Sequence, residues 1–529
     1  MASFGAMQRG YVGLSNEVKP SLDYTFTGSM FFETDTAKTY IWTGSGWREQ
    51  FIPVKSSFAD GVGNDAFGQK RVSSPTGIFD HKFISSKNST IWEERLFGCI
   101  IVHGAVTGAG FQIGETITGG TSGKTGVITA VGSGNITYTS SDNDFTDTET
   151  ITGGTSLSTA SVTTHDTGAH TQYNYYRSSV YLKTGTITGQ RVVRQTIRYF
   201  PYVPGCSQRI NTTQVFAPLD ANKNQYVMLG DDKNGVGIAI TGLTVNLIVR
   251  SNITGTAVDT IVSQSSWDDP MDGTGASGIT LDITKSQIQS IDFQWLGIGR
   301  VRFALNIGGI SIPIHEISHA NVTVGVYMKT PTLPVRYELI NVGTASGASN
   351  LEQICCSVSS EGGYQLPGME FSAIKPLTNE KAVTTRVPIM AIRLKNEFPA
   401  GQPNRRCMRF LDVEFYARSN DATFELMHVH DTLTMTATWT SVDASSGVEY
   451  SLDISALTAK HFHLVQAANL FSGTGNAGNG ESINSQFINQ HAFISQNFES
   501  NNSQMYVIYA TSRTGTANCS AHISWLESE

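Results

Sequence analysis

The sequence is poor in charge. Charged residues make up 15% of its 529 positions, against about 25% in a typical soluble domain. Long surface helices and coiled coils are built from Glu, Lys and Arg, so this shortage disfavours them. The 36 Lys and Arg against 44 Asp and Glu give a net charge of −8, and no long run of like charges appears. We therefore expect neither nucleic-acid binding nor attachment to an acidic membrane surface.

Long apolar runs are missing as well. No window reaches the roughly 18 uninterrupted apolar residues of a membrane span. The amino-terminal residues contain no apolar stretch of signal-peptide length. We expect a protein that is made in a cytoplasm and does not insert into a membrane.

Cysteine is scarce. Six cysteines are present and none forms a C-x-x-C pair, whereas a disulfide framework or a structural zinc would need more of them in a regular pattern. We predict reduced thiols that pack as small apolar residues. They are Cys99, Cys206, Cys355, Cys356, Cys407 and Cys519.

Glycine and short alternating segments are abundant. Glycine fills 52 of the 529 positions, about 10% against an average near 7%. Val236–Arg250 and Leu433–Thr440 alternate apolar with small polar residues, which is the period of a strand with one buried face. We predict an all-β, multidomain protein of β-sandwich or jelly-roll-like domains, with one helical turn at Asp282–Gln289.

Composition divides the chain into regions. We predict an N-terminal docking segment, 1–55, a principal β domain, 56–345, an inserted two-copy β repeat, 103–172, and a C-terminal β domain, 346–529.

The N-terminal segment is hairpin-like and aromatic. It is too short to form a large core, yet it carries Phe31, Phe32, Tyr40, Trp42 and Trp47. This is more aromatic surface than so short a piece is expected to bury by itself, so a partner protein is expected to cover it.

An internal repeat marks the insertion. Phe111–Ser122 recurs 34 residues later as Phe145–Ser156, with eight consecutive residues identical from Glu115 and Glu149 onward. Each copy is expected to form a strand, a Gly-Gly turn and a second strand, and the two copies to pair into one small β module. With few ionisable groups, the module is expected to be a spacer. The alternative is a display surface for a glycan or a neighbouring subunit.

His315-Glu-Ile-Ser-His319 matches H-E-x-x-H, which binds zinc when both histidines lie on one turn of a helix. The flanking residues alternate like strands, and on a strand positions i and i+4 lie about 13 Å apart. Glu338 lies nineteen residues after His319, where such a motif would have its third ligand, but it follows Pro331 and Pro334 in extended sequence. We predict neither a metal site nor catalysis at these residues.

Two His-x-His pairs, His428/His430 and His461/His463, place each pair on one face of a strand. Around a three-fold axis two such imidazoles become six nitrogen ligands. We favour ordinary core or surface histidines, because the adjacent carboxylate of Asp431 is expected to point to the opposite face.

Two other patterns favour loops. Gly473-Thr-Gly-Asn-Ala-Gly478 fits the dinucleotide fingerprint, but no apolar helix follows it. Asp268, Asp269 and Asp272 lack the alternate spacing of a calcium loop and are expected to cap a turn. No cofactor, metal or catalytic residue is therefore assigned.

A resemblance covers roughly residues 175 to 370. The segments that carry it are Arg191–Gln208, Trp267–Leu281, Ile291–Phe303, Tyr327–Glu338 and Gln353–Tyr364. Together they resemble a family of virion structural proteins from tailed bacteriophages, especially marine and cyanobacterial ones. Tyr40–Trp47 is similar to short modules of phage tail and fibre proteins, and the Glu-Thr-Ile-Thr-Gly-Gly-Thr-Ser repeat resembles small β repeats inserted in phage structural proteins.

The resemblance implies a component exposed on the virion without catalytic residues to carry over, and it leaves head, neck and tail open as the location. We predict that the chain is not an enzyme but a tail fibre or spike component that takes part in host attachment. One alternative is a capsid decoration or head fibre protein. Another is a glycan-cleaving tailspike, since paired glycosidase carboxylates are invisible in sequence. A long parallel β-helix would favour that enzyme, and no sustained run of short solenoid rungs is present.

We further expect a homo-oligomer, a trimer, whose N-terminal segment docks onto other virion proteins. The region after Ala467 is rich in Gly, Asn and Ser and holds Phe487, Phe493 and Phe498. That mixture suits contact with a host glycan or protein. The alternative is that the three phenylalanines pack inside the last β domain.

Overall fold

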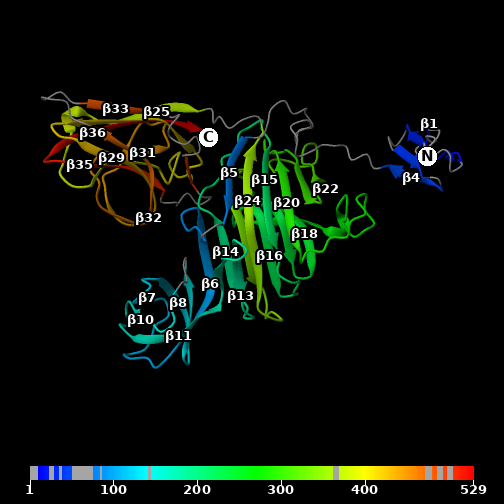
Figure 1. Cartoon of the computed structure of the whole chain (residues 1–529), viewed down its shortest axis with the longest axis horizontal. Coiled ribbons are helices and arrows are strands. Elements are labelled where there is room, and N and C mark those ends of the chain that lie inside the picture. Colours follow the sequence, from blue (N-terminus) through cyan, green and yellow to red (C-terminus); the bar gives the residue numbers. More distant parts are fainter. Residues whose placement is uncertain are drawn as a thin grey trace, which may run out of the picture.

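The computed structural model describes residues 10–22, 29–34, 39–43, 45–50, 76–83, 86–140, 145–361, 368–470, 479–484, 493–496 and 504–528. Within these ranges nearly every regular element is a strand (Figure 1). The helical elements described are two three-residue 3-10 turns, η2 Gln264–Ser266 and η3 Leu377–Asn379. The prediction of an all-β, multidomain protein is confirmed. No helix in the described part of the chain has the length and hydrophobicity that a membrane crossing needs.

The N-terminal segment forms a four-stranded sheet in the order β1 (Gly10–Gly13), β2 (Met30–Glu33), β3 (Thr39–Trp42) and β4 (Trp47–Gln50). The Trp47 ring lies edge-on to the rings of Tyr11, Phe31 and Trp42, with centroids 5.6–5.9 Å apart. Phe31 and Trp42 are buried, whereas Phe32 on the other face is 41% exposed. The sheet therefore buries part of its aromatic surface by itself, which weakens the argument that a partner must cover all of it.

The principal domain is a sandwich of two antiparallel sheets. The first contains β6 (Trp92–His103), β14 (Arg191–Thr196), β23 (Val335–Asn341), β16 (Lys223–Gly230), β17 (Gly235–Thr241), β18 (Thr244–Ser251) and β19 (Val258–Ser263), in that order. The second contains β12 (His170–Asn174), β13 (Ser179–Thr184), β24 (Ser349–Ser360), β15 (Gln208–Val215), β20 (Ser286–Phe293), β21 (Val301–Ile307) and β22 (Ile310–Ile317), with β5 (Thr76–Lys82) paired to β24.

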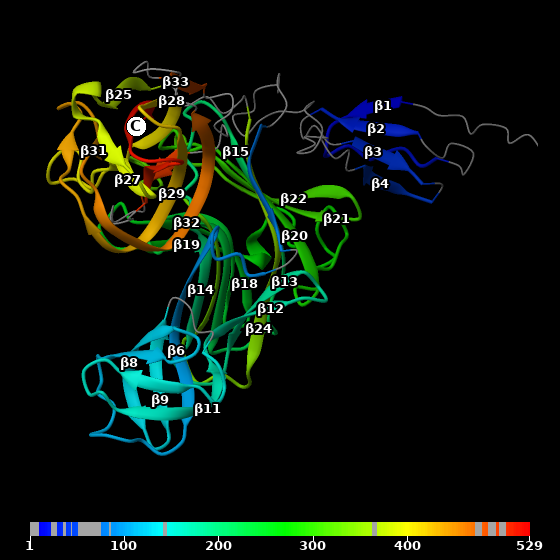
Figure 2. The same ribbon diagram turned by 60° about the vertical axis from the view of Figure 1, so that its left-hand side comes forward.

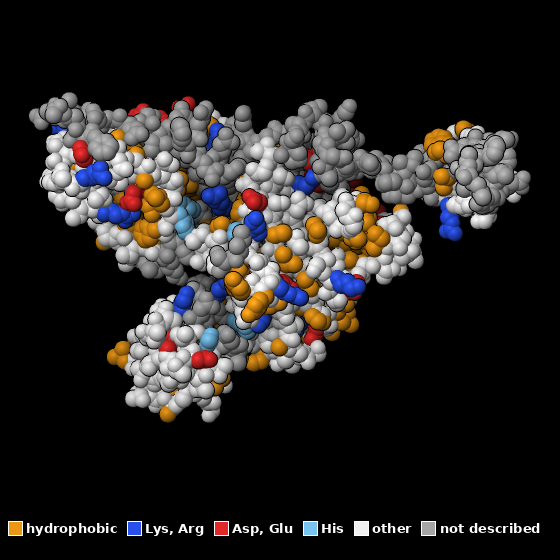
Figure 3. Space-filling model, viewed as in Figure 1, with side chains coloured by type: hydrophobic (Ala, Val, Ile, Leu, Met, Phe, Trp, Pro, Cys, Tyr) orange, Lys and Arg blue, Asp and Glu red, His pale blue; other side chains and the backbone are white. Residues whose placement is uncertain are grey.

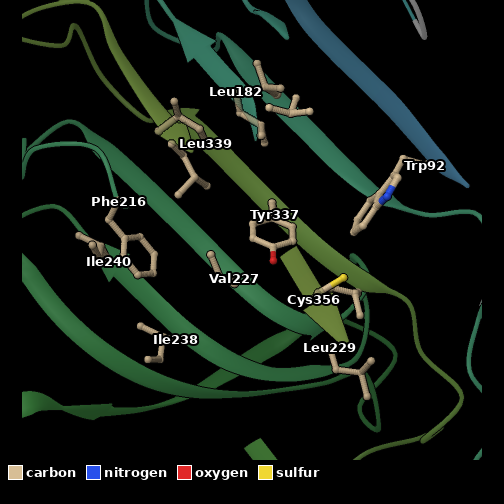
Figure 4. Close-up of a cluster of buried hydrophobic side chains, with 14 of the residues drawn as sticks. Trp92, Leu182, Phe216, Val227, Leu229, Ile238, Ile240, Tyr337, Leu339 and Cys356 are labelled. Carbon is tan, nitrogen blue, oxygen red and sulfur yellow. The ribbon is translucent and has the colours of Figure 1, made fainter. Parts of the chain in front are cut away.

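The core lies between these sheets. Alternate residues of β17 and β16 point inward from the first sheet and meet residues such as Leu182 and Cys356 from the second (Figure 4). Tyr337 is fully buried in the middle, and its hydroxyl donates to the backbone oxygen of Cys355 at 3.2 Å. The strand alternation predicted for Val236–Arg250 is therefore what fills this core, although the segment is a hairpin of two strands.

Two predictions about this domain are wrong. The boundary at residue 345 excludes β24, which pairs with β13, β15 and β5, so the C-terminal domain begins only at Met369. Asp282–Gln289 is not helical either. Asp282 accepts the N–H of Thr284 at 3.1 Å to form a turn, and β20 then starts at Ser286 because it pairs with β15.

The insertion is a closed six-stranded barrel (Figure 2). Its own strands are β7 (Thr116–Gly119), β8 (Thr125–Gly132), β9 (Asn135–Ser140), β10 (Thr150–Gly153) and β11 (Thr159–Gly168). The second half of β6 completes the ring by pairing with both β9 and β11. Closure removes free strand edges, and the predicted pairing of the two repeat copies, through β7 and β10, is confirmed.

The barrel begins and ends four residues earlier in the sequence than predicted. Cys99 pairs with Gly168, and the N–H of Ala169 donates to the oxygen of Gly98 at 3.4 Å. A Cβ on Gly168 would lie 2.5 Å from that oxygen, so only glycine permits this approach. The insertion therefore spans residues 99–168 rather than 103–172, and the predicted range would include part of β12.

The two repeat copies cap each other. Glu115 of the first copy accepts the N–H groups of Thr155 and Ser156 in the second, at 3.1 and 2.9 Å. Glu149 of the second copy accepts those of Thr121 and Ser122 in the first, also at 3.1 and 2.9 Å.

Burial opposes ionisation of Glu115 and Glu149, but the hydrogen bonds that each carboxylate accepts outweigh it and lower the pKa of both. The sequence identity of the two repeats thus has a structural cause. Each copy supplies both a glutamate and the Thr-Ser turn that the glutamate of the other copy binds.

The C-terminal domain is a second sandwich. One sheet holds β25 (Met369–Lys375), β36 (Ala517–Ser528), β28 (Cys407–Arg418) and β33 (Asn479–Asn484), with β26 (Lys381–Val383) on β36 and β34 (Phe493–Ser495) on β28. The other holds β30 (Thr440–Ser441), β31 (Val448–Ser451), β27 (Val387–Leu394), β35 (Met505–Ser512), β29 (Ala422–Thr436) and β32 (Ser455–Leu470). Phe487 and Phe498, and the side chain of Phe493, lie outside the described residues.

Candidate functional site

The H-E-x-x-H motif does not form a site. His315 lies on β22, as predicted, with Nδ1 3.1 Å from an oxygen of Asp268. His319 follows the strand and stacks on the ring of Tyr327, with centroids 4.0 Å apart. Glu316 pairs separately with an arginine, Arg300, at 2.8 Å. The two histidines therefore contact different parts of the sandwich.

Glu338 is a buried member of a charge network. It lies on β23, 3% exposed, with Arg191 at 2.6 Å and Arg336 at 2.8 Å. Burial alone would raise the pKa of Glu338, but the charges of Arg336 and Arg191 lower it. Asp232 contacts the same two arginines, and its pKa is also lowered. Carboxylates held ionised in this way hold no proton to donate as a general acid.

The acidic turn has a structural role, as predicted. Asp269 accepts the N–H groups of Met271 and Ser277 at 3.1 and 2.8 Å. Asp272 accepts that of Thr274 at 2.9 Å. The oxygens are used by the turn itself, which is the usual role of Asp at such positions.

The histidine pairs meet across a long hairpin. In the register of β29 and β32, His428 lies opposite His463 and His430 opposite His461. The rings of His428, His430 and His463 have centroids 5.5–6.2 Å apart, and the His428 ring lies 4.9 Å from that of Tyr506. For His428 and His430, the prediction that the pair shares a strand face is confirmed. The side chains of His461 and Asp431 lie outside the described residues, as does the loop at 473–478.

This cluster lies where the two sandwiches touch. Gln504 donates to the backbone oxygen of Ile197 at 3.1 Å, and Ser495 donates to that of Tyr199 at 2.7 Å. Burial is the main reason that the pKa of His428 falls to about 3, and nearby cations, Arg198 among them, lower it further. Within the described ranges, no three His, Cys, Asp or Glu side chains are grouped as ligands for a metal ion.

Two cavities open on the C-terminal sandwich. The first, of about 370 Å³, lies between the β25–β26 connection and the strands β30 and β31. Its lining consists of Lys375, Asn379, Glu380, Lys381, Thr438, Thr440, Tyr450, Leu452 and Asp453. Its volume falls in the range of small-ligand sites, and its lining is polar with one aromatic ring.

The second cavity, of about 570 Å³, is more apolar. It is lined by Arg386, Pro388, Ala456, Leu457, Phe462 and Tyr509. The Arg386 guanidinium stacks 3.9 Å from the Tyr509 ring centroid and pairs with Glu425 at 2.5 Å. Its single charged side chain is therefore already occupied by contacts within the protein.

Sequence reasoning missed both cavities. The polar groups of the first come from three segments, represented by Lys375, Thr438 and Asp453, which only the folded sheets bring together. No spacing rule connects them. One feature of the sequence could have indicated the first cavity. Charged residues are few in this chain, so a lysine within a strand, such as Lys375, is unusual.

Comparisons with known proteins assign no function to this chain. No protein-family model matches the sequence, and no curated protein matches it. A legume lectin-like domain from Entamoeba histolytica is 10% identical with a TM-score of 0.23, covering 38% of this chain and 90% of that one. A glycosyl hydrolase family protein from Mycobacterium fortuitum is 11% identical with a TM-score of 0.27, covering 53% and 99%. Lectin II from Ulex europaeus is 8% identical with a TM-score of 0.25, covering 37% and 91%. Similarities of this size carry no argument about what the chain binds or does.

Proposed function

We propose that this chain is a structural component of a tailed-phage virion, exposed on the particle and acting in host attachment as part of a tail fibre or spike. The observation that carries the proposal is that the phage-like segments and the cavities lie in different domains. The segments with phage resemblance contribute β14, β20, β21, β23 and β24 of the first sandwich, whereas both cavities lie in the C-terminal sandwich. A scaffold with a separate binding domain suits attachment.

The carboxyl groups and the surface of the protein are consistent with the proposal that it is not an enzyme. The pKa of every Asp or Glu for which a shift is resolved moves downward among the described residues, as for Glu338, so these carboxyls are poor general acids. On the face shown in Figure 3, Lys and Arg side chains are interspersed with Asp and Glu, and hydrophobic side chains form several separate groups. Incubating the protein with host polysaccharide is expected to release no new reducing ends. Their release would favour the glycan-cleaving tailspike.

Location on the particle is the direct test. Gold-labelled antibodies against the C-terminal sandwich are expected to mark the tail in electron micrographs of intact particles. Purified full-length protein is expected to compete with particles for adsorption to host cells. Label on the head would favour a capsid decoration or head fibre protein instead, and particles without any label would overturn the proposal.

Self-association is part of the same proposal, with a trimer as the expected state. Two loops of the first sandwich meet where Gly297 accepts the N–H of Tyr327 at 2.8 Å. They present exposed apolar side chains, among them Val322 and Val324 at 72% and 107% exposure. Such a patch on a protein surface is typical of an interface. Mass measurement in solution is expected to give three chains, and Val324→Asp to lower that number. A stable monomer of the unaltered protein would contradict the proposal.

The N-terminal sheet is proposed to dock onto other virion proteins, because Phe32 and Met30 remain 41% and 42% exposed on one face. Particles assembled with a chain lacking residues 1–55 are expected to lose this protein while the truncated chain still folds. Full occupancy of the truncated chain would exclude the docking role.

A further inference from the structure

The first cavity of the C-terminal sandwich holds a lysine whose hydrogen-bonding capacity is mostly unused. Lys375 ends β25 and is 3% exposed. Its ammonium donates to the backbone oxygen of Leu452 at 3.2 Å. An ammonium has three donors, so two remain for a molecule in the cavity that Lys375 lines.

The carboxylates of the cavity are already engaged. Asp453 accepts the N–H of Thr438 at 3.1 Å and the hydroxyl of Ser451 at 2.9 Å. Glu380 pairs with Arg418, which lies outside the cavity lining.

The lysines, in contrast, form no direct ion pair. Among the described residues, neither Lys375 nor Lys381 has a carboxylate within ion-pair distance. Burial and the charge of Lys381 lower the pKa of Lys375, and Asp453 only partly opposes this effect. A buried cation without an ion-pair contact is costly, so an anion that contacts Lys375 and Lys381 directly would be stabilised by both.

The rest of the lining fits a molecule that also carries hydroxyl groups. Thr440 and Asn379 supply hydroxyl and amide groups, and Tyr450 and Leu452 supply an aromatic and an apolar wall. An inorganic anion would use the lysines but would leave most of about 370 Å³ unfilled. A sugar ring with one carboxylate uses both parts of the lining.

We propose that this cavity binds an acidic sugar residue of the uronate type, with its carboxylate on Lys375 and Lys381 and its ring against Tyr450. The inference deepens the proposed attachment function and rests on it for the source of the sugar, a host-surface polysaccharide. The carboxylate chemistry is shared with small free anions, so the test must separate the two.

Titration calorimetry of the full-length protein would use three probes: a tetrasaccharide of glucuronic acid, a glucose tetrasaccharide of equal length, and inorganic sulfate. We expect binding of the uronate, which weakens as salt rises because charges are involved, and no detectable binding of the neutral sugar. Equal affinity for both sugars, or affinity for sulfate as high as for the uronate, would overturn the proposal.

Three variants locate the binding. Lys381→Gln, at the partly exposed rim, is expected to lower uronate affinity at least tenfold, and Lys375→Gln to lower it further. Lys285→Gln removes the same charge from an exposed position in the first sandwich and is expected to leave affinity unchanged. Lys375→Gln removes a buried group, so its loss of binding could arise from misfolding. Lys381→Gln therefore decides the matter, and unaltered affinity in that variant would exclude this cavity.

The two proposals fail in different ways. Absence of the chain from virions would overturn attachment while uronate binding by the purified protein still stands. Adsorption that the purified protein blocks, but that free glucuronate oligosaccharide and Lys381→Gln leave unchanged, would overturn the cavity proposal and leave attachment intact.

Discussion

In the first sandwich the buried arginines meet buried carboxylates, whereas in the C-terminal sandwich the buried Lys375 and His428 face a cavity or a domain contact. Arg194 is fully buried and pairs with Glu94, its direct neighbour in register on β6. Arg302 and Asp292 form a second such pair. In the C-terminal sandwich, Lys375 and His428 are buried without a carboxylate partner among the described residues.

The contrast is not absolute. The buried Lys223 of the first sandwich donates to oxygens of Gly347 and Ser349 rather than to a carboxylate, and Arg406 and Glu527 form one paired contact in the C-terminal sandwich at 3.1 Å. The contrast still separates two roles. A buried ion pair stabilises the scaffold, because removing either partner leaves the other charge buried without a counter-charge. Both charged groups are occupied by each other, so neither is available to bind a ligand. A buried basic group without an ion-pair partner behaves differently. A bound anion would stabilise the domain at Lys375, and protonation would destabilise it at His428.

The largest expected effect comes from breaking the scaffold pair. Arg194→Met leaves Glu94 buried with the more distant Lys87 ammonium, at 3.7 Å, in place of its paired guanidinium, and removes the bond from Arg194 to Gln353, which spans 2.8 Å. We expect a loss of about 3–5 kcal/mol in the free energy of unfolding, measured by urea denaturation. The double variant Arg194→Met with Glu94→Gln removes both charges and is expected to recover part of the loss. A single variant that costs under about 1 kcal/mol would contradict the assigned role of the pair.

Acid is expected to weaken the contact between the sandwiches. The unfolded pKa of His428 near 6.5 lies above its folded value of about 3, so the unfolded chain takes up the proton first as pH falls. Stability is therefore lost from about pH 6.5 downward, by about 2 kcal/mol between pH 7 and pH 5 for this one group, and the loss stops near the folded pKa.

Denaturation curves at several pH values check this dependence. His428→Gln is expected to flatten the stability profile over that window. Part of the slope remains, because burial also lowers the pKa of His81, to about 4, and that of His319. A profile that is equally steep in the variant would show that the histidine cluster does not sense acid.

The barrel offers a matched pair of smaller effects. Glu115→Gln and Glu149→Gln each replace a carboxylate that accepts two backbone N–H groups from the other repeat copy. We expect each to cost about 1–2 kcal/mol, and the two costs to be alike because the contacts are reciprocal. Hydrogen exchange of the amides at Ser122 and Ser156 measures each turn separately. A variant that exposes both turns equally would contradict reciprocal capping.

The fold was more predictable than the cavity, for reasons visible in single residues. Alternation in Val236–Arg250 predicted strands, since an inward face needs apolar side chains at every second position. The helical turn predicted at Asp282–Gln289 was wrong, because local capping residues look alike at turns and helix starts and the partner strand β15 is remote in sequence. Lys375 and Asp453 approach one cavity only through sheet pairing, so no local pattern announces them.

The smallest expected effect concerns the barrel as a whole. Deleting residues 99–168 and joining Gly98 to Ala169 through two glycines keeps every pair between β6 and β14. These ends already approach each other, with the Ala169 N–H 3.4 Å from the Gly98 oxygen, so a short link costs little closure entropy. The deletion should leave the stability of the sandwiches within about 1 kcal/mol of the full chain, since a closed barrel keeps most contacts within itself.

A deletion of 103–172 is the matched control. It also removes Thr171, whose hydroxyl donates to Glu94 at 2.6 Å, and with it the start of β12. Because Glu94 is the partner of the buried Arg194, that cut reaches the scaffold pair itself, and we expect it to be clearly less stable than the cut at the glycine neck. Thermal unfolding and mass in solution compare the two proteins. If the cut at the neck were as damaging as the control, the barrel would be part of the sandwich core rather than a module attached to it.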